Sequence, residues 1–273
     1  MMEEVFISTA ELGNLLSSHQ RLFLIDGSIL LTGSAKDSYV AKHIPGAHFF
    51  DQLEIRDKTA VHPMAYLPAE AFGQAMMALR VPNDGSLVVV YDQEGMRAAP
   101  RVWFVLRYYG YPRVRFLSGG LPKWEAEGRP LAKGPTAPFT CQADPSHYRC
   151  SEHPELVTDF ERVKSLTERL SAGRGDASLW DPRSPAAVSG TMIPQSINLF
   201  YQYLLNDDYT PKSPALILQT LQQGGLDPNK PVVVTCNRGL MACTGALLLA
   251  HAGKKDVQLN RGSWLEWSRR AKL

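Results

Sequence analysis

Short apolar runs rich in β-branched residues alternate with longer stretches of helical spacing along the chain. Residues 23–25, 87–91 and 114–117 have the length and composition of buried strands. Residues 68–79 and 101–109 carry apolar side chains at helical spacing. Apolar strands that alternate with helices predict an α/β fold, in which helices cover both faces of a parallel sheet.

The same pattern occurs twice, in the same order. "LFLIDGS", "HIPGAHFF" and "VVVYDQEGMRAAP" in the first half correspond to "ASLWDPRS", "MIPQSINLF" and "VVVTCNRGLMACTG" in the second. The segment between the halves is rich in Pro and Gly and has no periodicity, which is typical of a linker. We therefore predict two domains, 1–135 and 151–273, joined by a linker over 136–150.

Composition narrows the classes of function. The chain has 273 residues, of which 44% are hydrophobic, and its 29 basic and 27 acidic residues leave a net charge of +2. This near-neutral balance suggests neither a nucleic-acid nor a membrane partner. The start, "MMEEVFISTAELG", resembles neither a signal nor a transit peptide, so a cytoplasmic protein is expected. The four Cys form no C-x-x-C or other metal-ligand spacing, and we expect neither a metal site nor a cofactor.

Cys236 stands between an apolar run, 232–234, and a small-residue run, 242–250, that predicts a buried helix. In a parallel α/β sheet, such strand-to-helix junctions line the ligand crevice. The loop that follows the thiol can turn successive backbone N–H groups inward as an anion-binding nest, since Gly239 permits a positive φ. These donors, the helix dipole and Arg238 would stabilise a thiolate, so Cys236 is a candidate nucleophile. The alternative is a packed core cysteine.

The first half of the chain provides an internal control for this loop. Tyr91 to Ala98 align without a gap on Thr235 to Ala242, and Asp92 stands where Cys236 does. A carboxylate cannot perform thiolate chemistry. We therefore predict that the first domain is catalytically silent.

The residues around Cys236 narrow its chemistry. A tyrosine-phosphatase loop needs an Arg six positions after the Cys, where this chain has Ala242. The seven His show no local signature of a papain-like base. A thiolate without an acid–base partner suits attack on another sulfur. Arsenate or phosphate chemistry at the same loop stays as an alternative.

Together with "HIPGAHFFD", "FLSGGLPKW" and "GSWLEW", these segments resemble the tandem-rhodanese sulfurtransferases over almost the whole chain. The resemblance implies two rhodanese-like domains, each a five-stranded parallel sheet flanked by helices. It also implies a persulfide on Cys236, formed from a small anionic donor, thiosulfate or 3-mercaptopyruvate. The implied acceptor is cyanide, a small thiol or thioredoxin. A low-turnover sulfur carrier or interaction module is the alternative.

The donor-binding residues depart from the patterns typical of that family. The loop Cys-Asn-Arg-Gly-Leu-Met-Ala matches neither donor type, although Arg238 falls where the thiosulfate type has Lys. The segment after Asp181 lacks the family's Arg-containing insert but keeps Arg183, a candidate for donor binding or a structural partner of Asp181. His43 and Arg261 are further candidates, His43 with a structural alternative. The predicted active-site loop comprises Asn237, Arg238, Gly239, Leu240, Met241 and Ala242. We interpret Cys243 as a packed helix residue, with a resolving thiol as the alternative.

Overall fold

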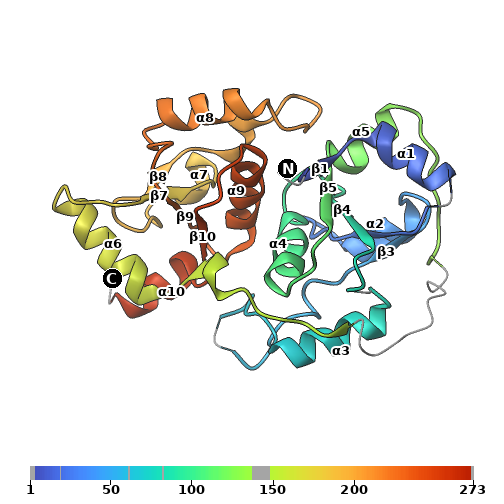
Figure 1. The fold of residues 1–273 in the computed structure, drawn as a ribbon, viewed down its shortest axis with the longest axis horizontal. Helices are drawn as coiled ribbons and strands as arrows, with labels where there is room; N and C mark the ends of the chain where they lie inside the picture. The colour runs from blue at the N-terminus through green and yellow to red at the C-terminus, as the bar shows by residue number, and fades with distance from the viewer. Residues whose placement is uncertain (1–3, 19, 61, 82, 137–147, 272–273) are drawn as a thin grey trace. The chain divides into compact units, whose positions relative to one another are not determined.

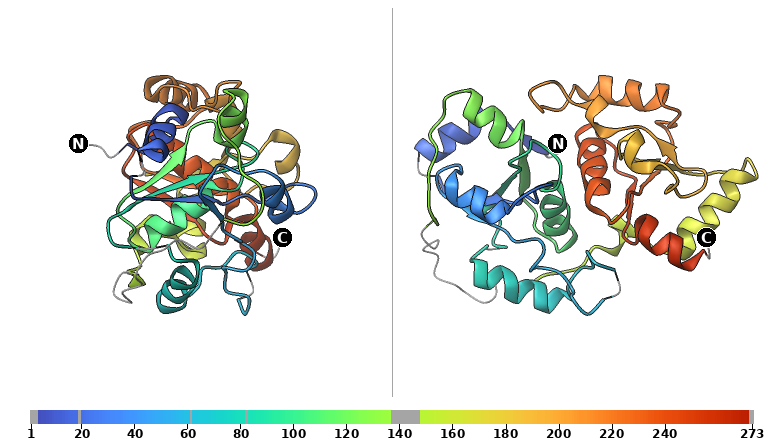
Figure 2. Two further views of the ribbon diagram at one scale, coloured as in Figure 1. Left: turned by 90° about the vertical axis from the view of Figure 1, so that its right-hand side faces the viewer. Right: turned by 180° about the vertical axis from the view of Figure 1, so that it is seen from behind.

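The computed structural model describes residues 4–18, 20–60, 62–81, 83–136 and 148–271. These residues form two compact units, 4–59 with 66–153 and 60–65 with 154–271. Within each unit, helices lie on both faces of a sheet (Figures 1 and 2). None of the described helices combines the length and hydropathy that crossing a bilayer requires.

The first unit is built on a sheet with the strand order β1-β5-β4-β2-β3, and all of its strand pairs are parallel. Its elements are β1 (Phe6–Ile7), α1 (Thr9–Ser17), β2 (Leu22–Asp26), α2 (Ala35–Ala41), β3 (Ala47–Phe49), α3 (Ala69–Leu79), β4 (Leu87–Tyr91), α4 (Pro100–Tyr108), β5 (Val114–Leu117) and α5 (Gly120–Ala126). The strands predicted at 87–91 and 114–117 have the observed bounds of β4 and β5.

The second unit repeats this topology with the strand order β6-β10-β9-β7-β8, again all parallel. Its elements are η2 (Pro154–Leu156), β6 (Val157–Thr158), α6 (Phe160–Ser171), β7 (Ser178–Asp181), α7 (Pro185–Val188), β8 (Ile197–Asn198), η3 (Tyr201–Leu204), α8 (Pro214–Gln223), β9 (Val232–Val234), α9 (Leu240–His251), β10 (Val257–Asn260) and α10 (Ser263–Arg270). The prediction of two five-stranded parallel sheets flanked by helices is confirmed.

Local sequence explains how the helices begin and which face they bury. Ser8 and Asp159 cap α1 and α6, where their side chains accept backbone N–H groups. Helix α6 buries only one stripe, including Val163 and Leu166, against the second sheet. Helix α9 is apolar around its circumference and buries every residue from Ala242 to Leu249. The carboxyl edge of β9 is therefore joined by the loop 235–239 to a helix whose middle is fully packed.

The predicted linker falls largely on residues 137–147, which lie outside the described residues. Beyond it, Ser151 N–H donates to the Tyr109 carbonyl (3.3 Å) and His153 N–H to the Tyr108 carbonyl (2.9 Å). The chain thus stays in contact with the first unit as far as His153.

Candidate active site

Cys236 lies two residues beyond β9, and its side chain is buried with 2% exposure. The Gly239 N–H donates to its sulfur at 3.0 Å. Gly239 has φ 83°, a left-handed conformation that turns the chain into α9. Cys243, in the first turns of α9, directs its thiol at the Gly239 carbonyl (3.1 Å), which favours a packed role for it.

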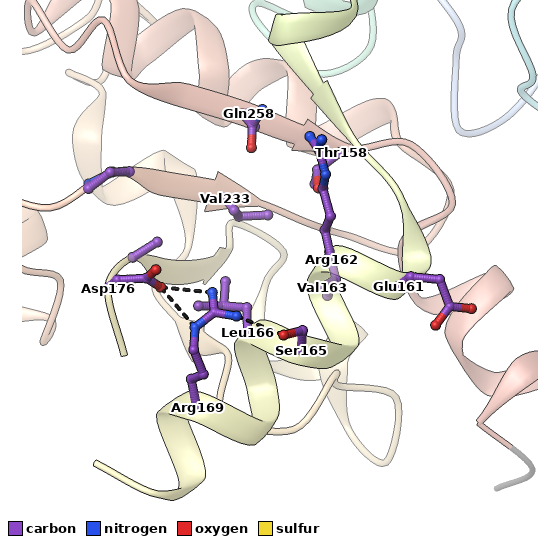
Figure 3. A pocket seen from close by; sticks show the side chains of 12 residues that line it. Thr158, Glu161, Arg162, Val163, Ser165, Leu166, Arg169, Asp176, Val233 and Gln258 are labelled. Carbon is purple, nitrogen blue, oxygen red and sulfur yellow. Dashed lines mark hydrogen bonds and ion pairs between the residues drawn. The ribbon is translucent and has the colours of Figure 1, made fainter. Parts of the chain in front are cut away.

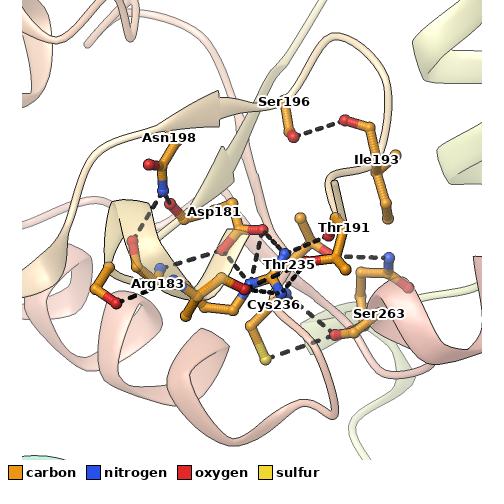
Figure 4. A network of polar contacts seen from close by, with 12 residues as sticks. Asp181, Arg183, Thr191, Ile193, Ser196, Asn198, Thr235, Cys236 and Ser263 are labelled. Carbon is orange, nitrogen blue, oxygen red and sulfur yellow. Dashed lines mark hydrogen bonds and ion pairs between the residues drawn. The ribbon is translucent and has the colours of Figure 1, made fainter. Parts of the chain in front are cut away.

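Ser263 is a site residue that the sequence analysis did not single out. Its hydroxyl oxygen accepts the Cys236 N–H at 3.2 Å and lies 3.8 Å from the sulfur (Figure 4). Its φ is 49°, which is strained for a residue with a side chain. The matching residue of the first unit is Gly120, with φ 58°. A serine at a place where the repeat has glycine is the signal that could have revealed it.

The first backbone donors of α10 hold the carbonyls of the Cys236 loop. Trp264 N–H donates to the Cys236 carbonyl at 3.0 Å, and Leu265 N–H donates to the Asn237 carbonyl at 3.1 Å. In the first unit, Leu121 N–H makes the equivalent bond to the Asp92 carbonyl at 3.0 Å. In both units, therefore, the loop carbonyl is already bonded at the start of the last helix.

The corresponding loop of the first unit forms an anion nest around its own carboxylate. Asp92 Oδ1 accepts the Glu94 N–H at 2.8 Å. Asp92 Oδ2 accepts the N–H groups of Arg97, Ala98 and Ala99 at 3.0, 2.7 and 2.8 Å. In the first unit, the sequence frame shared by the two loops thus forms a concave array of donors around the Asp92 carboxylate.

Arg183 is fully engaged inside the second unit. Its Nε and Nη2 donate to the Asp181 carboxylate, the closest contact being 2.6 Å. Nη2 also donates to the Thr191 carbonyl (2.6 Å), and Nη1 donates to Thr191 Oγ1 and the Ala187 carbonyl, both at 3.2 Å. The side chain is buried among these partners (Figure 4). These contacts occupy every guanidinium nitrogen and favour the structural alternative for Arg183.

The other predicted side chains are distributed unevenly. Asn237 and Arg238 are exposed, Leu240 and Met241 are half-buried, and Gly239 and Ala242 are buried. Arg261 is exposed, and its carbonyl lies 3.3 Å from the position of a Cβ on Gly239.

His43 belongs to the first unit and is buried there. Its Nδ1 contacts the Tyr39 carbonyl at 2.9 Å, and its Nε2 contacts Thr136 Oγ1 at 3.2 Å. The imidazole also stacks on the Tyr39 ring, with the ring centroids 4.2 Å apart. Both ring nitrogens are therefore engaged, which favours the structural alternative.

The aspartates at the ends of β2 and β7 have different partners. Asp181 pairs with Arg183, whereas Asp26 accepts the Ser28 hydroxyl (2.6 Å) and the Gln93 amide (2.7 Å). Burial raises the pKa of Asp26 from 3.8 to about 6, although these hydrogen bonds act in the opposite direction. The first unit thus buries a carboxyl group without the arginine that its repeat has.

A groove of about 470 Å³ lies between α6 and the second sheet (Figure 3). Val163, Leu166 and Val233 contribute its apolar lining, and Arg169 at its rim is ion-paired with Asp176 at 2.8 Å. Cys236 is not among its lining residues. Among the described residues, no three His, Cys, Asp or Glu side chains gather into a group that could hold a metal ion.

Comparison with known proteins agrees with the repeated fold. A family model described as a rhodanese-like domain matches residues 8–127 and again 163–270. Thiosulfate sulfurtransferase of Rattus norvegicus is 34% identical over 251 residues, covering 88% of this chain and 82% of that protein. 3-Mercaptopyruvate sulfurtransferase of Homo sapiens is 33% identical over 266 residues, covering 93% of this chain and 87% of that protein.

A solved structure extends the likeness to three dimensions. The crystal structure of Tum1 protein from Saccharomyces cerevisiae is similar with a TM-score of 0.85 at 26% identity, covering 99% of this chain and 96% of that chain. Both halves of the sequence match the same domain model, and both sheets have the same topology. The chain therefore belongs to the rhodanese-like family of sulfurtransferases and carries two copies of its domain.

Proposed function

We propose that the protein moves a sulfane sulfur from a small anionic donor to a thiophilic acceptor through a persulfide on Cys236. Thiosulfate and 3-mercaptopyruvate are the proposed donors, and relatives named for each have nearly equal identity to this chain. Cyanide, a small thiol and thioredoxin are the proposed acceptors. The first domain is proposed to be silent because Asp92 replaces the nucleophile.

The observation that carries this proposal is the set of four backbone donors around Asp92. In a cysteine persulfide, the outer sulfur stands two bonds from Cβ, as the carboxylate oxygens of Asp92 do. The second loop shares the sequence frame. Met241 and Ala242 lie in the first turn of α9, where backbone N–H groups have no acceptor within the helix and are available to a ligand. Such donors would stabilise a persulfide anion.

The chemistry requires two displacements at sulfur. The Cys236 thiolate attacks the outer sulfur of thiosulfate, and the new S–S bond forms as the old one breaks, with sulfite leaving with the electron pair. With 3-mercaptopyruvate, the C–S bond breaks instead, and the carbon takes a proton from water to give pyruvate. Cyanide then takes the outer sulfur as thiocyanate and restores the thiolate.

Charge at the entrance is proposed to come mainly from Arg238. This side chain is exposed on the loop, while the guanidinium of Arg183 is occupied by Asp181 and Thr191. Arg261 is proposed as a secondary source of positive charge, and its backbone lies beside Gly239. A compact dianion such as thiosulfate would gain most from Arg238, because its two negative charges lie close together.

The test uses mass spectrometry of the full chain after treatment with each donor. Cys236 should gain one sulfur, about 32 Da, because the thiolate is the nucleophile, and Cys236→Ser should gain none. The thiosulfate-to-mercaptopyruvate ratio of kcat/KM should then fall in Arg238→Ser. Absence of the adduct with both donors would contradict the proposed reaction, and turnover of p-nitrophenyl phosphate would instead support phosphate chemistry.

A low-turnover sulfur carrier is the second candidate. It is favoured by one observation, the full engagement of Arg183, which removes a predicted donor-binding side chain. A persulfide that forms stoichiometrically but is released slowly to cyanide, dithiothreitol and thioredoxin would favour this function over a rapid sulfurtransferase.

A further inference from the structure

Asn260 ends β10 and is buried, with 2% exposure. Its Nδ2 donates to Thr235 Oγ1 at 3.1 Å. The corresponding strand ends of the first unit carry Leu117 and Tyr91. The second unit therefore joins two neighbouring strands by a side-chain hydrogen bond at a position where the first unit has an apolar residue.

This amide is costly to bury, because its carbonyl oxygen is left without a hydrogen bond among the described residues. Within the described part of the chain, Asn260 Oδ1 is buried and has no hydrogen-bond partner. A buried polar atom without a partner destabilises a protein. Since the fold accepts leucine at the matching place, an asparagine here indicates a function for the bond that Nδ2 makes.

The bond continues the pairing of β9 and β10 past the end of their ladder. The last paired residues of the two strands are Val234 and Leu259. One residue further, the Asn260–Thr235 bond links the strand ends from which the site residues emerge. Cys236 directly follows Thr235, so this bond fixes the backbone that carries the thiol.

Ser263, three residues after Asn260, forms a second connection between Asn260 and the Cys236 loop. The Ser263 hydroxyl donates to the Asn260 carbonyl at 2.9 Å, and its oxygen accepts the Cys236 N–H at 3.2 Å. With its oxygen 3.8 Å from the sulfur, this hydroxyl needs only a rotation and a small approach to donate to a thiolate. That donation requires the ends of β9 and β10 to keep their spacing.

We propose that Asn260 is a positioning residue which, through Thr235, holds Cys236 against the Ser263 hydroxyl and thereby sustains the reactivity of the thiolate. The inference rests on the proposed role of Cys236. It concerns the reactivity of the sulfur itself, so it is measurable without any sulfur donor.

The experiment compares Asn260→Leu and Thr235→Val, the first importing the residue of the first unit and the second removing only a hydroxyl. Each should slow alkylation of Cys236 by iodoacetamide at neutral pH about fivefold, and kcat similarly with little change in KM. The double variant should be no slower than either single one, since both remove one bond. Thr235→Ser should restore the rate, and Thr158→Val serves as the control for loss of a buried hydroxyl on a neighbouring strand.

Wild-type alkylation rates in both single variants would overturn the proposal, as would effects that multiply in the double variant. Should Asn260→Leu fail to fold, the nearly isosteric Thr235→Val and its serine rescue still decide the question. Absence of a persulfide in the wild type would refute the proposed sulfur transfer, whereas the alkylation contrast would remain a test of Asn260.

Discussion

The loops after β4 and β9 share a sequence frame but differ in what fills them. In the first unit, the Asp92 carboxylate takes four backbone N–H groups, and α4 begins only at Pro100. In the second unit, Cys236 accepts one N–H, and α9 already begins at Leu240, which aligns with Met96. A resident carboxylate thus satisfies the donors of one loop, while on the proposed function the other loop keeps first-turn donors for an incoming group.

This difference teaches that the frame gathers backbone donors around a carboxylate in the first unit, where Asp92 stands in place of the thiol. The first unit uses it for internal structure, and on the proposed function the second uses it for reaction. Exchanging or removing the side chains at positions 92 and 236 is therefore the most direct way to test the comparison.

The largest effect is expected from Cys236→Asp, which gives the second loop the occupant of the first. Sulfur transfer should fall at least about 10³-fold, because the nucleophile is lost. The carboxylate should satisfy the loop donors, so the variant should unfold at a higher temperature than Cys236→Ser. Thiocyanate formation and calorimetry measure the two quantities, and a less stable Asp variant would contradict the equivalence of the loops.

The reverse change, Asp92→Ala, should destabilise the first unit by about 3 kcal/mol, because it leaves four backbone donors without their charged acceptor. Urea unfolding measures the loss. Asp92→Asn keeps the shape and one acceptor oxygen, so about half of the loss is expected there. Equal stability of all three proteins would show that the carboxylate does not hold the loop.

The third test separates strain from chemistry at Ser263. Ser263→Ala and Ser263→Gly both remove the hydroxyl, and each should lower kcat about tenfold, since one hydrogen bond to a charged group contributes at least about 1.5 kcal/mol. The glycine variant should be more stable than the alanine variant by about 1 kcal/mol, because only glycine adopts φ 49° without strain. Full activity of the glycine variant would show that the Ser263 hydroxyl has no role in the reaction.

The last test concerns pH and the unequal aspartates Asp26 and Asp181. The pKa of Asp26 is about 6 when folded and 3.8 ordinarily, so the folded state binds the extra proton, and stability falls as pH rises through this range. Asp26→Asn cannot lose a proton. The free energy of unfolding of Asp26→Asn, measured with urea, should therefore rise by about 2 kcal/mol relative to that of the wild type between pH 4 and pH 7. A constant difference between the two proteins across this range would contradict the raised pKa.

Periodicity was sufficient to predict elements whose burial pattern is uniform. Strands β4 and β5 appear at the predicted residues because each is a continuous apolar run between turn residues. Helix α9 was expected from residue 242 but begins at Leu240, since the left-handed Gly239 starts the turn before the small-residue run. Helix onset is determined by backbone conformation, which hydrophobicity does not report.

The sequence predicted the part of the site that consists of consecutive residues. The prediction was incomplete for residues that only the fold brings together. The strand-to-helix junction at Cys236 is visible in a few consecutive residues. The sequence left two roles open for Arg183, and only the folded segment brings Thr191 and Ala187 around its guanidinium. Ser263 is 27 residues from Cys236 in the chain, and no spacing rule joins them.

The burial of α9 on all sides has a consequence for how the site responds to ionic strength. Cys236 is 2% exposed and α9 is enclosed from Ala242 to Leu249, so dissolved ions screen interactions at the sulfur less than those of an exposed side chain. Arg238, in contrast, is exposed and open to screening. Added salt should therefore weaken the binding of an anionic donor, seen as a higher KM. The alkylation rate of Cys236 should stay almost unchanged, so ionic strength separates donor capture from the reactivity of the sulfur.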